Sequence, residues 1–174
     1  MKLNRIFTAL LLCMTLLLSM FAMAACGGDG QSEETRDPNK APATLDSIWT
    51  AVSAVVPNAD KLTDAPETQL GSFFNGAVPD DFASYKRVVQ SMSTSIDEIG
   101  IFEAKTPEDV KKIEEMVDGF FDLYNSLWND DYLETEYPKL KNAERVTSGN
   151  FVMYVILDDE TRAAAITAFE NETK

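Results

Sequence analysis

The stretch from Phe151 to Leu157 most strongly limits how this chain can fold. It reads Phe-Val-Met-Tyr-Val-Ile-Leu, so both of its alternating faces are apolar. A strand with one solvated face alternates apolar and polar residues, whereas a strand buried on both faces is apolar throughout. The stretch therefore predicts a central strand that is covered on both sides.

The C-terminal part of the chain predicts a β-β-α unit built around this strand. Residues 143–147 and 151–157 flank Ser148-Gly149-Asn150, a composition typical of a hairpin turn. An acidic run at 158–160 then favours the start of a helix that extends through Phe169, because carboxylates stabilise the positive end of the helix dipole.

A second unit of the same kind is expected earlier in the chain. Residues 84–92 show both helical spacing and a loose alternation, and we assign them to a strand, whereas residues 96–105 alternate more clearly. Thr106-Pro107 then suits the start of a helix, and its apolar stripe extends to Trp128. The predicted fold class is α+β: an antiparallel sheet of about four strands from two β-β-α units, with helices packed on one face.

A further helix is expected before the sheet. Apolar residues recur at helical spacing from Leu45 to Val56, Thr44 can cap the first turn, and Pro57 ends the pattern. Residues 58–79 hold several Gly and Pro residues and predict an irregular connection. A single globular domain is therefore expected over residues 44–174.

The N-terminus predicts a lipoprotein signal peptide over residues 1–25. Lys2 and Arg5 precede an apolar run, and small residues lead to Cys26. Met23-Ala24-Ala25-Cys26 resembles a bacterial lipobox, although Met stands where Leu is usual. We expect a diacylglycerol on the Cys26 sulfur, which would hold the chain on the outer face of the cell membrane. An uncleaved transmembrane anchor is the alternative, since the apolar run is nearly long enough to span a bilayer.

Residues 26–43 predict the lipidated cysteine followed by a flexible tether. The segment is rich in Gly and polar residues and has little that can pack. Of the two cysteines in the chain, Cys13 leaves with the signal peptide, and the sulfur of Cys26 would be alkylated. No disulfide, thiol nucleophile or cysteine metal site is therefore expected.

Charge and composition exclude several functional classes. The leader holds two basic residues and no acid, so the mature chain has 13 basic and 29 acidic residues, a formal charge of −16. A surface of this charge repels nucleic acid and anionic lipid headgroups. The chain also has no histidine, which rules out Ser-His catalysis, Cys-His catalysis and His-ligated zinc within it.

Phe73 and Phe74 are candidates for contact with a ligand. The pair lies between Gly71 and Gly76 in the irregular connection. It can fill the core beneath a loop, or it can form an exposed hydrophobic binding loop. We favour the first interpretation, because large exposed apolar patches are uncommon on monomers.

The stretch 129–140 combines acids with tyrosines. Its carboxylates could bind calcium, which takes oxygen ligands, but their spacing does not match an EF-hand loop. We therefore predict a solvated connection or a short helix, and no metal site.

Three segments together resemble a known family. They are Cys26-Gly27-Gly28, the stretch from Asp97 to Phe102, and the stretch from Gly149 to Ile156. They resemble small Firmicutes lipoproteins that carry domain of unknown function 4358, and the resemblance covers most of the chain from Leu45 onward. It implies a Gram-positive cell surface and no assigned activity. Within these motifs Glu98 is a candidate ligand contact, with a solvent-facing strand position or a partner for a nearby cap as its alternative roles.

The sequence predicts a membrane-anchored extracytoplasmic binding or interaction module, with no catalytic residue, metal or cofactor assigned. A Gly-rich phosphate loop, a free thiol and metal-ligand spacing are all missing from the sequence. The expected partners are the membrane, through Cys26, and a protein, peptide or small solute. Two alternatives stay open. One is a cell-wall enzyme that uses carboxylates such as Glu98 and Asp131, about 5 to 9 Å apart; the other is an assembly factor for another membrane protein.

Overall fold

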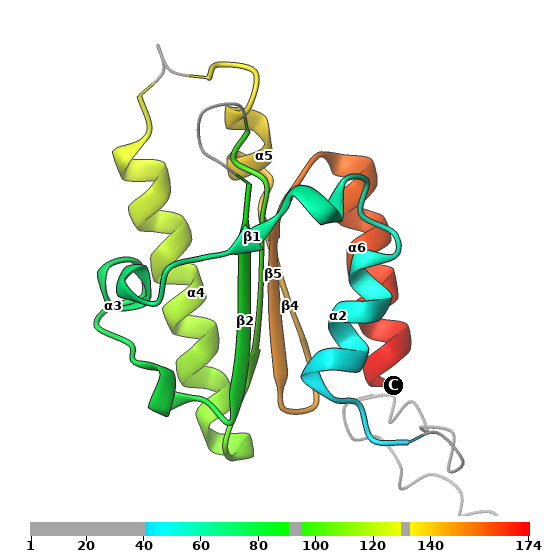
Figure 1. The fold of residues 1–174 in the computed structure, drawn as a ribbon. Coiled ribbons are helices and arrows are strands. Elements are labelled where there is room, and N and C mark those ends of the chain that lie inside the picture. The colour runs from blue at the N-terminus through cyan, green and yellow to red at the C-terminus, as the bar shows by residue number, and fades with distance from the viewer. Residues whose placement is uncertain (1–40, 91–94, 130–132) are drawn as a thin grey trace, which may run out of the picture. The chain divides into compact units, whose positions relative to one another are not determined.

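A computed structural model describes residues 41–90, 95–129 and 133–174. Within these residues the strands form one antiparallel sheet of five strands, in the order β1-β2-β3-β5-β4 (Figure 1). The strands are β1 (Thr63–Asp64), β2 (Ser84–Val89), β3 (Glu98–Glu103), β4 (Glu144–Ser148) and β5 (Phe151–Ile156).

Five α-helices accompany the sheet in the described residues. Two short 3-10 turns, η2 (Ala59–Lys61) and η3 (Pro79–Asp81), lie in the connections before β2. The α-helices are α2 (Leu45–Ser53), α3 (Thr68–Phe73), α4 (Pro107–Leu127), α5 (Tyr137–Lys141) and α6 (Asp159–Thr173).

The helices cover both faces of the sheet, so the prediction that they pack on one face was wrong. Figure 1 shows α3 and α4 on one side of the strands, and α2 and α6 on the other. The reason lies in β5, all six residues of which are buried. Val152, Tyr154 and Ile156 join the core under α4, whereas Met153 and Val155 join the core under α2 and α6. An apolar strand of this kind requires protein on each side.

The two β-β-α units are confirmed. The β2-β3 hairpin is followed by α4, and the β4-β5 hairpin, with its turn at Gly149-Asn150, is followed by α6. Residues 84–89 are a strand, as assigned, although residues 91–94 lie outside the described part of the chain. The additional strand β1 was not predicted, because two exposed residues give no periodic signal.

The helix starts follow the sequence closely. The side chain of Thr44 accepts a hydrogen bond from the Ser47 N–H before α2. Asp158 accepts one from the Thr161 N–H at 3.0 Å before α6. Thr106 occupies the N-cap position before Pro107 as expected, but its hydroxyl donates to Asp109 at 2.9 Å instead of accepting a backbone bond. The first backbone N–H groups of a helix have no partner within the helix. Thr44 and Asp158 each accept a bond from one of these groups, and Pro107 has no N–H group to satisfy.

Candidate functional site

A groove of about 750 Å³ lies between α4 on one side and α3 with the turn that follows it on the other. This volume falls in the range of ligand pockets, about 300 to 1,000 Å³. The lining is mixed. Apolar side chains from both walls contribute to it, namely Phe73, Phe74, Phe82, Ile113, Met116 and Leu123, and so do polar ones, namely Ser72, Asn75, Asp81, Asp109, Lys112 and Glu115. The geometry therefore provides a concave surface of mixed polarity between α3 and α4.

The wall formed by α3 is short and ends in a sharp reversal. Asn75 and Gly76 both have positive φ, 52° and 81°, a conformation that glycine adopts without strain. The Gly76 N–H donates to the Gly71 carbonyl at 2.8 Å, and the Ala77 N–H donates to the Phe74 carbonyl at 3.0 Å. The chain then returns along the groove toward Phe82, which closes its end.

The Phe73-Phe74 pair has a divided role. Phe74 is 1% exposed, and its ring packs against the rings of Phe102 and Phe120 with centroids 5.7 and 4.6 Å apart. Phe73 is half-buried and meets the Phe120 ring edge-on at 6.1 Å. The favoured interpretation, a plug for the core beneath a loop, therefore describes Phe74, whereas both residues also line the groove.

Gly119 lies on the α4 wall of the groove, and its lack of a side chain leaves space there. A Cβ atom built at this position meets no other atom within 4 Å. The helix continues unbroken from Pro107 to Leu127, so neither close packing nor a break accounts for the glycine. Glycine costs a helix up to about 1 kcal/mol relative to alanine. The space beside Gly119 is therefore open on the groove side.

Beneath α3 lies a buried ion pair between Arg87 on β2 and Glu98 on β3. Arg87 Nε donates to Glu98 Oε1 at 2.6 Å, and both side chains are 6% exposed. Arg87 Nε also lies 3.1 Å from the Tyr154 hydroxyl, and that hydroxyl donates to Glu98 Oε1. Removing two charges from water costs several kcal/mol, which attraction and hydrogen bonds offset only when the geometry is good.

Gly100 makes this arrangement possible. It sits between Arg87 and Tyr154 in the register of β2, β3 and β5. A Cβ atom at Gly100 would come within 2.0 Å of the Tyr154 ring, so the ring occupies the space that a side chain would take. The phenol thus crosses β3 and places its hydroxyl beside Glu98.

The surroundings of the cluster keep the Arg87 guanidinium charged and the Tyr154 phenol protonated. Burial alone would lower the pKa of Arg87, but the oxygens of Tyr154 and Glu98 outweigh it and raise that pKa above its usual range. Burial, together with the charge of Glu98, raises the pKa of Tyr154 well above its ordinary value. The guanidinium is therefore charged and the phenol is protonated, which matches the hydrogen bond from Tyr154 to Glu98.

Arg87 also connects the sheet to the α3 wall. Its Nη1 donates to the side-chain carbonyl of Gln69 at 3.0 Å. Its guanidinium carbon lies 5.6 Å from the ring centroid of Phe73 and 5.4 Å from that of Phe74, within cation–π range. The buried ion pair thus holds α3 against the sheet, and with it one wall of the groove.

The three residues predicted as ligand contacts, Phe73, Phe74 and Glu98, all contact the Arg87 side chain. The sequence analysis did not single out Arg87. Glu98 is 4% exposed, and its carboxylate accepts hydrogen bonds from Arg87 and Tyr154. It therefore takes neither of the alternative roles considered for it, a solvent-facing strand position or a partner for a helix cap. The same burial disfavours Glu98 as a catalytic carboxylate in a cleft. Asp131, its suggested partner in an enzyme, lies outside the described residues.

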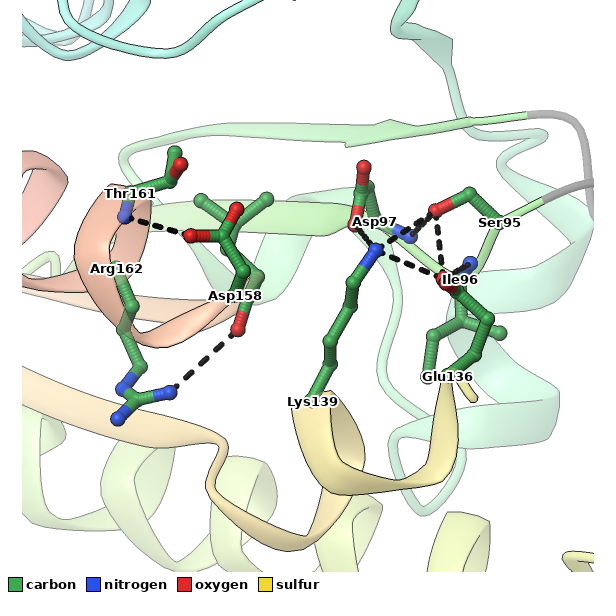
Figure 2. A network of polar contacts seen from close by, with 9 residues as sticks. Ser95, Ile96, Asp97, Glu136, Lys139, Asp158, Thr161 and Arg162 are labelled. Atoms are coloured by element: carbon green, nitrogen blue, oxygen red, sulfur yellow. Dashed lines mark hydrogen bonds and ion pairs between the residues drawn. The ribbon is translucent and has the colours of Figure 1, made fainter. Parts of the chain in front are cut away.

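A second polar cluster joins the start of β3 to α5 (Figure 2). Lys139 points between Asp97 and Glu136, with its Nζ 2.8 Å from a carboxylate oxygen of each. Glu136 also accepts hydrogen bonds from the Ser95 hydroxyl and the Ile96 N–H. Burial favours the neutral acid, but these bonds outweigh it and hold the pKa of Glu136 below its ordinary value. Because each of these groups is already paired, the cluster acts as a structural clamp.

The predicted short helix in the acidic stretch is present as α5, while Asp130 and Asp131 lie outside the described residues. Across the described ranges, no group of three or more His, Cys, Asp and Glu side chains is arranged to hold a metal ion. In the same ranges, no helix combines the length and the apolar character needed to cross a membrane.

The fold is an α+β domain with one antiparallel sheet. On one face of that sheet, α3 and α4 form the two walls of a groove. The chain belongs to the family of domain of unknown function DUF4358, whose family model matches residues 62–157, more than half of the chain. Neither a curated protein nor a solved structure shows significant similarity to it. The groove and the buried cluster lie inside the matched range, whereas α2 and α6 lie outside it.

Proposed function

We propose that this protein is a membrane-anchored extracytoplasmic lipoprotein whose domain binds a ligand in the groove between α3 and α4. The observation that carries the binding function is the groove itself, which has a mixed apolar and polar lining and a ligand-sized volume. Its α3 wall is held to the sheet by the buried pair of Arg87 and Glu98, and Gly119 leaves its α4 wall open. A wall fixed in advance loses little conformational freedom when a ligand binds.

The anchor is proposed from the N-terminal sequence. Cys26 lies outside the described residues, so its lipidation and the Gram-positive cell surface stay predictions. Two acyl chains on the sulfur of Cys26 would provide stable attachment, because each buried methylene contributes about 0.8 kcal/mol and one chain alone binds only reversibly. The tether up to Ala43 would leave the domain free of the bilayer.

Changing Cys26 to alanine is expected to abolish lipidation. In a bacterial host that processes lipoproteins, the wild-type chain should incorporate labelled palmitate and fractionate with the membrane. Cys26→Ala should take up no label, because the acceptor thiol is gone. Cys13→Ala is the matched control and should be labelled like the wild type. Equal labelling of Cys26→Ala and the wild type, or no label in either, would show that the anchor is not a lipid on Cys26.

A further inference from the structure

We infer that the groove binds a peptide segment of a protein partner, one that presents apolar side chains flanked by Lys or Arg. This inference rests on the proposed function and specifies its ligand. It is carried by three properties of the groove: its lining, its length along α4 and the charge of its two walls.

The lining and the length favour an elongated apolar ligand. The apolar side chains of the α4 wall run from Ile113 to Leu123, a distance of about 15 Å at the rise of an α-helix. This distance matches about three turns of a peptide helix, which would present apolar residues at positions i, i+4 and i+7. The half-buried side chains of Phe73, Leu123 and the flexible Met116 offer surfaces for such residues.

The charge of the walls favours basic flanks on that peptide. The groove is bordered by three carboxylates, those of Asp81, Asp109 and Glu115, and by one ammonium group, that of Lys112, which pairs with Asp109 at 2.6 Å. The remaining charge of the border comes from Asp81 and Glu115. Beyond the groove, α4 carries four further acids and one further lysine, and residues 68–82 carry one further acid and no base. Complementary charge accelerates encounter and selects the partner more than it adds affinity, and it is screened by salt.

The ring of Phe73 adds a second attraction for a cation. Phe73 lines the groove and is half-buried, whereas Phe74 and Phe82 are buried, and a ring face attracts an ammonium or guanidinium group at close range. Inside the domain, the rings of Phe73 and Phe74 already lie within range of the Arg87 guanidinium. A Lys or Arg beside an apolar anchor can therefore use the same chemistry from the groove side.

The test uses the full chain in nanodiscs of phosphatidylcholine, with empty nanodiscs as the background, and three fluorescent peptides of roughly a dozen residues. One has leucines at i, i+4 and i+7 with lysines between them; one keeps the leucines and has glutamates instead; one keeps the lysines and has serines in place of the leucines. Fluorescence anisotropy should show that the first binds at least about tenfold more tightly than either of the others. Its affinity should fall as salt rises from about 50 to 300 mM.

Gly119→Leu places a large side chain on the α4 wall of the groove and should weaken binding of the leucine-lysine peptide at least about tenfold. Ala163→Leu adds the same side chain at an exposed position of α6, on the opposite face of the sheet, and should bind like the wild type.

Equal binding of the lysine and glutamate peptides, or unchanged binding by Gly119→Leu, would overturn the inference. If a small solute and no peptide stabilises the wild type but not Gly119→Leu, the peptide inference fails and the proposed groove function stands. If no ligand distinguishes the two proteins, both fail.

Discussion

Replacing Glu98 with alanine is expected to lower the free energy of unfolding by about 3 to 5 kcal/mol. The change leaves the Arg87 guanidinium buried without a counter-charge and the Tyr154 hydroxyl without its acceptor. Loss of one partner of a buried pair is costly because the remaining charge cannot return to water. Urea denaturation at constant m would measure the change as a shift of the midpoint.

The matched control for this prediction is an exposed ion pair on the same sheet. Asp64 and Lys86 lie 3.0 Å apart, but the Asp64 side chain is 79% exposed. Asp64→Ala should therefore cost less than about 1 kcal/mol. A loss in Glu98→Ala as small as that in Asp64→Ala would contradict the account of a buried charge pair. The double variant Arg87→Met with Glu98→Leu should recover part of the loss, because it removes both charges together.

Replacing Gly100 with alanine is expected to destabilise the protein by about 3 kcal/mol or more. The new Cβ would lie 2.0 Å from one atom of the Tyr154 ring and 2.6 Å from another, so the ring must leave its place between the strands. Its movement would also break the hydrogen bond to Glu98. Thermal and urea denaturation, followed by circular dichroism, measure the loss.

Gly119→Ala makes the identical chemical change in a place where nothing lies within 4 Å, and it should raise stability by up to about 1 kcal/mol. The opposite signs at the two glycines separate a steric clash from a general effect of removing glycine. In a Tyr154→Ala background, Gly100→Ala should cost much less than in the wild type, because the clashing ring is gone. A full additive loss in that background would show that the ring is not the cause.

The sheet could be predicted from the sequence because its central strands carry strong periodic patterns. Phe151 to Leu157 indicated a doubly covered strand, and the structure buries every residue of β5. The placement of helices on one face was inconsistent with that strand, since an apolar strand needs a cover on both sides. The short elements β1 and α3 were missed because two and six residues are too few for a pattern to stand out.

The candidate site was only partly predictable. The Phe73-Phe74 pair and Glu98 were identified as unusual for their surroundings, and the structure places them in contact with one guanidinium. Arg87 was missed because a basic residue in a strand is ordinarily taken to be exposed, and only the register shows it beside Gly100. The role of Gly119 depends on empty space beside it, which no local sequence pattern reports.

The most direct test of the central claim, that the groove is the ligand site, is a paired thermal-shift measurement. Wild type, Gly119→Leu and Ala163→Leu are melted with peptides, wall fragments, small solutes and divalent metals. A ligand at 100 times its dissociation constant should stabilise the wild type and Ala163→Leu by about 2.7 kcal/mol. Gly119→Leu alone should melt at or above the wild-type temperature, because leucine favours the helix, and should lose the ligand-induced shift. A ligand that stabilises Gly119→Leu as much as the wild type would place the binding site elsewhere.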